Sequence, residues 1–166
     1  MIKLTTRQLA ITGLLGAVAV VLGMTPLGFI PVPTPAGHAT IMHIPAILGG
    51  ILEGPVVGGL VGLIFGVHSF LRATNAFFAD PIISILPRVF IGVMAYMAYR
   101  ITKSGAAAAV IGTATNTIGV LGLIVLKGYL PMAAAVGIGI THGIPEIAVA
   151  VLLTVLLVKG IQRFRR

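Results

Sequence analysis

The sequence predicts an all-α integral membrane protein: a six-helix bundle whose two termini both lie in the cytoplasm. Of its 166 residues, 58% are hydrophobic and 8% are charged, whereas a soluble domain carries about 25% charged residues. The charges are too few to cover a surface in water, so lipid is the expected solvent. Eight of the eleven Lys and Arg residues fall at alternate breaks between apolar runs, and cytoplasmic loops collect such cations. These eight are Lys3, Arg7, Arg100, Lys103, Lys159, Arg163, Arg165 and Arg166.

The first predicted helix covers residues 6–24, an apolar run of about the length that crosses a bilayer. It follows Lys3 and Arg7 as in a signal peptide, but no convincing small-residue cleavage site comes after it, so we interpret it as a retained helix. Residues 26–37 then contain four prolines. Because proline lacks an N–H and cannot continue a helix, this segment predicts a stiff, extended outer loop.

The second and third predicted helices cover residues 38–53 and 55–71. The sequence Glu53-Gly54-Pro55 separates them, and Pro55 suits a first helical position. Both are short for a full crossing, so we expect tilt or shielding by neighbouring helices. Residues 72–80 follow as a polar break.

The last three predicted helices cover residues 81–100, 105–127 and 132–159, with a kink expected at Pro145. Six crossings place both termini on one side of the membrane and leave Arg72 and Lys127 on the other. So many residues are committed to the membrane that residues 1–166 are expected to form a single transmembrane domain.

Polar groups inside the apolar spans are the candidates for function, because ionisable groups in a membrane are costly and usually face the interior or a cavity. Arg88 has no acidic residue three or four positions away. Its partner could be Glu146, Asp80 or a ligand carboxylate, which Arg binds through two parallel hydrogen bonds; snorkelling to the outer interface is a further interpretation. His142 and Glu146 share one helical face at a spacing of four.

His43 and Asn116 also lie within predicted spans, where a packing role and a ligand contact are both open interpretations. Phe77 and Phe78, in the polar break, could stack on a ring or anchor the chain at the interface.

Several classes of chemistry are not expected. The absence of cysteine excludes disulfides and thiolate metal sites. His38 and His43 are five positions apart, which does not suit two metal ligands on one helical turn. No phosphate-binding loop of the form G-x-x-x-x-G-K-[ST] is present, so this chain is not expected to hydrolyse ATP. The net charge of +8 comes from segment ends, which favours contact with lipid headgroups over nucleic acid.

Small residues recur at a spacing of four, which lets helix backbones approach closely. We expect most of these pairs to pack inside the bundle, whereas a small-residue face on the first helix could instead dock a partner membrane subunit. The pairs are Gly13 and Ala17, Ala19 and Gly23, Gly58 and Gly62, and Gly62 and Gly66.

The run from Thr40 to Pro55, continued by residues 56–62, resembles the hairpin between the second and third helices in S components of energy-coupling factor (ECF) vitamin transporters. Asp80-Pro81 and Leu86-Pro87-Arg88 fit the entry to the fourth helix in that family. The six helices, the cytoplasmic termini and the long first outer loop are similar as well.

This resemblance implies a binding subunit of a prokaryotic plasma membrane, with no catalytic residues, metal or cofactor of its own. It would bind a small water-soluble vitamin beneath the first and third outer loops, and dock to a transmembrane T subunit that carries two ATPase subunits. Pantothenate is the preferred vitamin, since a pocket with His and Arg would suit its carboxylate. Hydroxymethylpyrimidine, pyridoxine, riboflavin and folate also fit the scheme.

The expected substrate-binding residues are His38, His43, Arg72, Asn75, Phe77, Arg88, Asn116, His142 and Glu146. The expected docking face on the first helix consists of Ala10, Gly13, Gly16 and Ala17, where the family often shows Ala-x-x-x-Ala.

Two other functions are carried as alternatives. One is a structural six-helix scaffold protein of the cell-shape type, without small-molecule transport. The other is a membrane enzyme or metal carrier built on the histidines.

Overall fold

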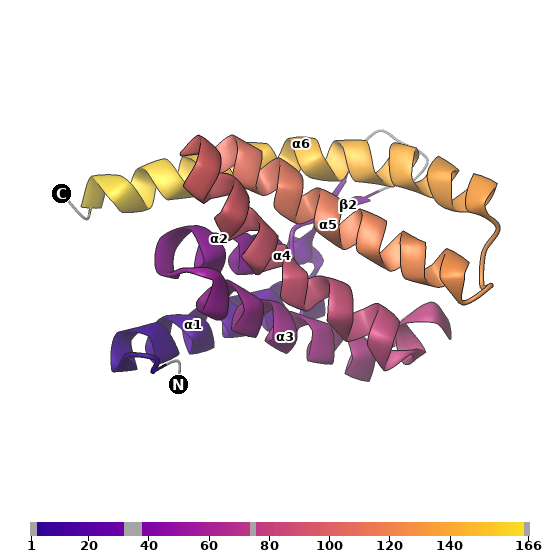
Figure 1. The fold of residues 1–166 in the computed structure, drawn as a ribbon, viewed down its shortest axis with the longest axis horizontal. Coiled ribbons are helices and arrows are strands. Elements are labelled where there is room, and N and C mark those ends of the chain that lie inside the picture. Colours follow the sequence, from indigo (N-terminus) through magenta and orange to yellow (C-terminus); the bar gives the residue numbers. More distant parts are fainter. Residues whose placement is uncertain (1–2, 32–37, 74–75, 165–166) are drawn as a thin grey trace.

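The computed structural model describes residues 3–31, 38–73 and 76–164, and its helices pack as one bundle (Figure 1). Five helices in this part of the chain are long and apolar enough to cross a membrane, and α2 is shorter. The protein is therefore an all-α membrane bundle, as predicted. Its helices are α1 (Thr6–Met24), α2 (Ile44–Glu53), α3 (Pro55–Arg72), α4 (Pro81–Thr102), α5 (Gly105–Leu126) and α6 (Met132–Phe164).

Local sequence signals set most helix boundaries. Thr5 and Gln8 form a reciprocal capping box that starts α1. The Asp80 carboxylate accepts a hydrogen bond from the Ile82 N–H at 2.9 Å and so starts α4, and the Ser104 hydroxyl does the same for α5. At the other end of the chain, α6 continues through Pro145 as one helix to Phe164, beyond its predicted end.

The second predicted helix, residues 38–53, is wrong in its first third. Strand β2 (His38–Thr40) pairs there antiparallel with β1 (Phe29–Pro31), which follows the 3₁₀ turn η1 (Pro26–Gly28). Strand β1 offers β2 a hydrogen-bonding edge, and Pro45 lies in the first turn of α2, where proline is favoured. Ten helical residues span about 15 Å, half of a bilayer core of about 30 Å. The second crossing is thus part strand and part helix.

A seam of glycines joins α3 to α4. A Cβ atom built on Gly62 would lie 2.0 Å from the Arg88 carbonyl oxygen, and one on Gly58 would lie 2.9 Å from the Gly92 Cα. One turn further along, a Cβ on Gly66 would lie 2.9 Å from the Ile85 Cα. The spacing of four therefore reflects backbone-to-backbone packing inside the bundle, as predicted for Gly58 and Gly62.

The hydrophobic core is concentrated in one half of the bundle. Its larger cluster includes Ile47 of α2, Val57 of α3 and Ile91 of α4, all fully buried, and reaches every helix. The smaller cluster, at the opposite end, consists of Ile83, Val120 and Ile124 with partly buried neighbours. The half with less packed apolar volume is the half that contains β1 and β2.

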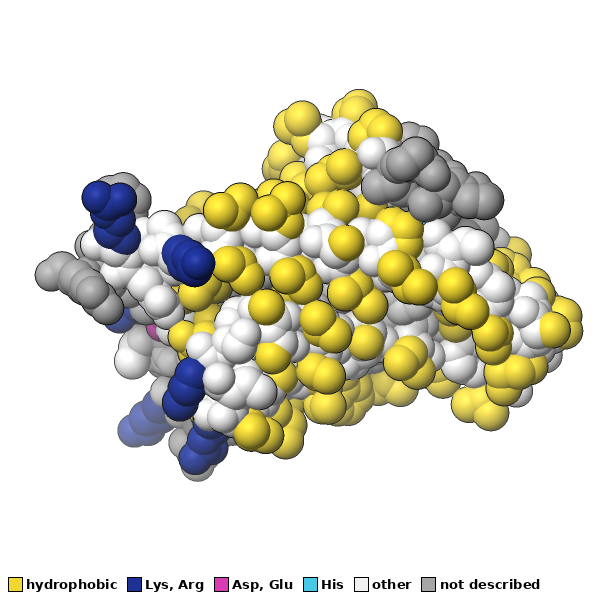
Figure 2. Space-filling model, turned by 90° about the horizontal axis from the view of Figure 1, so that it is seen from above, with side chains coloured by type: hydrophobic (Ala, Val, Ile, Leu, Met, Phe, Trp, Pro, Cys, Tyr) yellow, Lys and Arg dark blue, Asp and Glu magenta, His cyan; other side chains and the backbone are white. Residues whose placement is uncertain are grey.

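Both described ends of the chain lie at the same end of the bundle (Figure 1). Lys and Arg side chains gather at one end of an otherwise apolar surface (Figure 2), which identifies that end as cytoplasmic. There, Arg7 Nη2 lies 2.7 Å from Glu53 Oε1.

The outer end of the bundle carries an ion pair of its own. Lys127, after α5, donates to Asp80, and this hydrogen bond lowers the pKa of the Asp80 carboxyl. The pair ties the start of α4 to the end of α5, directly beside the 3₁₀ turn η2 (Ala76–Ala79).

Candidate functional site

The outer half of the bundle encloses a cavity of about 540 Å³, within the range of about 300–1,000 Å³ typical of small-molecule sites. Its walls come from the β1–β2 hairpin, α3, η2, α4, α5 and α6. The lining residues are Gly23, Phe29, Thr40, Met42, Phe65, His68, Ser69, Arg72, Phe77, Phe78, Arg88, Asn116, Thr117, Val120, Leu121, Ile124, Leu130, Ile138, His142 and Glu146.

Arg88 supplies the positive wall of the cavity and is only 4% exposed. Its Nη1 donates to the Ile83 carbonyl oxygen at 2.5 Å. The guanidinium carbon lies 4.9 Å from the centre of the Phe78 ring and 5.7 Å from that of Phe65, within reach of cation–π attraction. Within the described chain, Arg88 Nε has no hydrogen-bond partner. The described residues therefore leave one donor of Arg88 unused.

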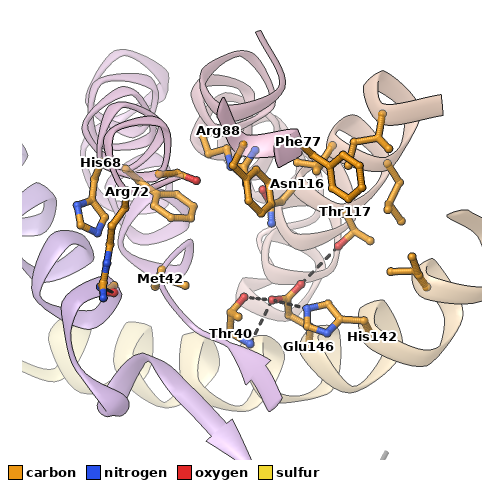
Figure 3. A pocket seen from close by; sticks show the side chains of 18 of the residues that line it. Thr40, Met42, His68, Arg72, Phe77, Arg88, Asn116, Thr117, His142 and Glu146 are labelled. Atoms are coloured by element: carbon orange, nitrogen blue, oxygen red, sulfur yellow. Dashed lines mark hydrogen bonds and ion pairs between the residues drawn. The ribbon is translucent and has the colours of Figure 1, made fainter. Parts of the chain in front are cut away.

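The sequence left Glu146 and Asp80 as possible ion-pair partners of Arg88. Asp80 is paired with Lys127 instead, and no ion pair links Arg88 to Glu146 among the residues described. Arg88 and Glu146 face each other across the cavity (Figure 3), so their opposite charges meet any ligand that lies between them.

Glu146 supplies the negative wall and is 2% exposed. Its Oε1 accepts hydrogen bonds from the Thr40 N–H at 3.2 Å and from the Thr40 hydroxyl. His142 Nε2 lies 3.7 Å from the same oxygen, and the Thr117 hydroxyl lies 3.5 Å from Oε2. One carboxylate thereby fixes the end of β2 against α6, close to α5 (Figure 3).

The remaining walls combine an amide with aromatic rings. Asn116 lines the cavity from α5, and its Oδ1 is a buried acceptor with no partner in the part of the chain that the structure describes. Phe77 of η2 packs against Tyr129 with ring centres 5.7 Å apart. This contact, together with the Asp80–Lys127 pair, holds η2 beside the outer side of the cavity.

At the side of the cavity nearest α1, Arg72 Nη1 donates to the Gly23 carbonyl oxygen. His68 lies one helical turn before it on α3, and Met42 follows β2 (Figure 3). Arg72 is itself exposed, so its charge is screened more than that of Arg88.

Six of the nine residues predicted to bind substrate line this one cavity: Arg72, Phe77, Arg88, Asn116, His142 and Glu146. His43 does not, because it is fully buried and its Nε2 is 2.9 Å from the Thr113 hydroxyl of α5. This position favours the packing interpretation of His43 over a ligand contact. Asn75 lies outside the described residues, as does the side chain of His38.

The predicted docking face of α1 divides in two. Ala10, Gly13 and Ala17 are exposed on the surface of α1. Gly16 is buried, and a Cβ atom there would lie 2.5 Å from Ile64 Cδ1 of α3. Gly16 therefore belongs to the internal seam between α1 and α3 rather than to an outer face, which corrects that part of the prediction.

Sequence reasoning missed several lining residues, including Thr40, Met42, Phe65, His68 and Thr117. Thr40 and Met42 were assigned to a regular helix, so their position beside the broken crossing was hidden. Phe65 and Thr117 are ordinary residues of apolar helices, and no spacing separates them from packing residues. His68 enters the sequence prediction only as one of the histidines of the alternative metal carrier.

The groups around the cavity suit an organic ligand with a carboxylate at one end and hydrogen-bonding groups at the other. Arg88 offers a donor to an anion, whereas Glu146, Asn116 and Thr117 accept or exchange hydrogen bonds with hydroxyl or amide groups. Among the residues described, no three side chains of the types His, Cys, Asp or Glu gather as a metal site would require.

Comparisons with known proteins agree with this geometry. Residues 7–158 match the family described as "ECF transporter, substrate-specific component". A solved chain described as the S component of a bacterial ECF transporter has a TM-score of 0.72 at 24% identity, covering 96% of this chain and 98% of that one. That likeness shows a shared fold.

Two curated relatives are similar in sequence. The pantothenic acid transporter PanT of Lactococcus lactis subsp. cremoris is 32% identical over 158 residues, covering 76% of this chain and 79% of PanT. The biotin transporter BioY of Rhizobium etli is 32% identical over 149 residues, covering 83% of this chain and 80% of BioY. This chain belongs to the family of substrate-specific S components of ECF transporters, multi-pass membrane proteins that recognise substrate and are not themselves catalysts.

Proposed function

We propose that this chain binds pantothenate in the outer cavity and delivers it to an ECF transporter for uptake. The observation that carries the proposal is the buried Arg88, whose Nε has no partner among the described residues and whose wall faces a cavity with a carboxylate on its far side. The similarity to PanT supports the same vitamin.

The functional groups of pantothenate, taken from its carboxylate end to its hydroxyl end, match the residues that line the cavity from Arg88 to Glu146. Its carboxylate would accept from Arg88, which binds planar anions well. Its central amide N–H would donate to Asn116 Oδ1, and its hydroxyl groups would reach Glu146, Thr117 and His142. Its methyl groups would pack on the aromatic and aliphatic side chains of the cavity. Each partner on the protein is a group that the structure places at the cavity wall.

Biotin is the second candidate, because BioY is as similar to this chain as PanT is. Biotin also has a carboxylate for Arg88, but its ring carries N–H donors and no hydroxyl group. The two vitamins thus differ at the Glu146 end of the cavity rather than at the Arg88 end.

Equilibrium dialysis of the purified protein with labelled pantothenate tests the proposal. We expect a submicromolar Kd, competition by unlabelled pantothenate, and biotin binding roughly 100-fold weaker, since its differently placed polar groups would leave buried groups unpaired at a cost of about 1–3 kcal/mol each. Mass spectrometry of small molecules retained through purification provides an independent check. Tighter binding of biotin would overturn the vitamin assignment, and failure of every vitamin to bind would overturn the pocket.

We further propose that the exposed small residues of α1 dock a transmembrane T subunit, which associates with two ATPase subunits that hydrolyse ATP. The family match favours this role over the structural scaffold protein. A Cβ atom on Gly13 meets nothing within 4 Å among the described residues, so the residue leaves room for another backbone to approach.

Gly13→Leu is therefore expected to leave pantothenate binding unchanged while it lowers copurification with the T subunit and vitamin uptake by cells. Gly137→Leu on α6 is the matched control, because its Cβ also meets nothing within 4 Å. Normal uptake by the Gly13 variant, or an equal loss in the control, would contradict docking through this face.

A further inference from the structure

Pro87 lies inside α4, directly before the arginine that faces the cavity. In an α-helix each N–H bonds to the carbonyl four residues earlier, so the N–H of residue 87 would normally occupy the Ile83 carbonyl oxygen. Proline has no N–H. The sequence thus removes the usual partner of one buried carbonyl, that of Ile83.

Arg88 takes up that free carbonyl. Its Nη1 donates to the Ile83 oxygen at 2.5 Å, and Ile83 is fully buried, so an unsatisfied carbonyl there would be costly. Side chains on helices lean toward the N-terminal turn, which carries the guanidinium back toward Ile83. One nitrogen of the guanidinium, Nη1, is then held by the backbone of α4 itself.

The anchor limits how the guanidinium can face the cavity that Arg88 lines. With Nη1 on Ile83 and the guanidinium beside the Phe65 and Phe78 rings, Nε is buried without a partner in the described chain. Without the anchor, the flexible side chain could turn about several bonds, and each rotamer given up on ligand binding would cost affinity.

The proline is held in place by a glycine on the neighbouring helix. A Cβ atom at Gly119 of α5 would lie 2.9 Å from Pro87 Cβ, so the ring occupies space that any other residue at position 119 would fill. The position of the proline is therefore fixed by packing between α4 and α5.

We propose that Pro87 is a positioning residue for Arg88: by leaving the Ile83 carbonyl free, it fixes the guanidinium and sets the preference of the cavity for a carboxylate over a neutral group. This inference rests on the proposed binding of a carboxylate by Arg88. It predicts that Pro87 affects the affinity for the ligand carboxylate and leaves the other ligand contacts in the cavity unchanged.

The test compares two ligands on the Pro87→Ala variant, which regains the N–H. One is pantothenate, and the other is its alcohol analogue, in which a hydroxymethyl group replaces the carboxylate. We expect affinity for pantothenate to fall roughly tenfold, as the loss of one hydrogen bond to a charged group allows, and affinity for the alcohol to change less than about twofold. Pro87→Ser, which also regains the N–H, should give the same ratio.

Two further variants complete the design. Pro145→Ala restores a helix N–H on α6, where none of the described arginines bonds to the freed carbonyl, and should leave the ratio of the two affinities unchanged. In an Arg88→Met background, Pro87→Ala should have no further effect on that ratio.

An equal loss for both ligands in Pro87→Ala would show a packing role and overturn the inference, as would an unchanged ratio. If Arg88→Met leaves the ratio of the pantothenate and alcohol affinities unchanged, Arg88 does not recognise the carboxylate. The proposed role of Arg88 and the inference about Pro87 would then both be overturned. If Arg88→Met abolishes the preference and Pro87→Ala does not reduce it, the proposed function stands and only the inference fails.

Discussion

Arg88→Met is expected to weaken pantothenate binding roughly 100-fold, because it removes a buried charged donor worth about 3 kcal/mol to a carboxylate. Methionine keeps much of the volume and the apolar stem beside Phe65 and Phe78, so the fold should survive. It also leaves the Ile83 carbonyl without a donor, and the apparent melting temperature should fall by a few degrees. Equilibrium dialysis and thermal unfolding in detergent measure the two effects separately.

Arg88→Lys is the matched control for charge. A lysine keeps the positive charge, but its single ammonium cannot present a planar fork to Ile83 and to a carboxylate together. We expect an affinity between those of the native protein and the methionine variant. Native affinity in the methionine variant would show that the ligand carboxylate lies elsewhere in the cavity, for instance beside Arg72.

Gly62→Ala is expected to prevent normal assembly of the bundle. The added Cβ would lie 2.0 Å from the Arg88 carbonyl oxygen and 3.2 Å from the Val89 Cα, and these backbone atoms cannot move unless α3 and α4 separate. Overpacking of a well-packed core typically costs 1–3 kcal/mol and occasionally more, and a contact this close should cost about 3 kcal/mol or more. Size-exclusion chromatography in detergent should show little monodisperse protein.

Gly59→Ala, on the same helix, is the control for helix propensity. Its Cβ would lie 3.6 Å from a Val93 side-chain carbon, an ordinary contact, and alanine favours a helix over glycine by about 1 kcal/mol. This variant should be as stable as the native protein or more so. Equal stability of the two variants would mean that α3 and α4 adjust their separation freely, contrary to the packed seam.

The long helices could be predicted because their signals are local. Length, apolarity and breaks at proline or at polar residues define α1, α3, α4, α5 and α6. The broken second crossing could not be predicted, because residues 38–40 become a strand only when residues 29–31 lie beside them, and that pairing is tertiary. An apolar run of marginal length does not by itself distinguish a helix from a strand followed by a short helix.

The candidate site was predictable only where charge made a residue conspicuous. Arg88 and Glu146 stand out because a membrane seldom tolerates an ionised group without a function or a partner. His43 is also a polar residue in an apolar span, but its Nε2 bonds to Thr113 away from the cavity. Only the packing of α2 against α5 reveals this contact. Phe65 and Thr117 carry no signal in sequence, since their neighbours along each helix are equally apolar or small.

The concentration of packed core in the cytoplasmic half has a consequence for how such proteins diversify. Close contacts among Gly50, Gly58 and Gly92, together with fully buried aliphatic side chains, secure the inner end, whereas the vitamin cavity depends on a strand pair, a short turn and a few helix tips. Substitutions at the outer end can therefore alter ligand choice at little cost to folding. A chimera that exchanges residues 26–43 and 73–80 with those of a relative should remain folded and acquire part of that relative's selectivity.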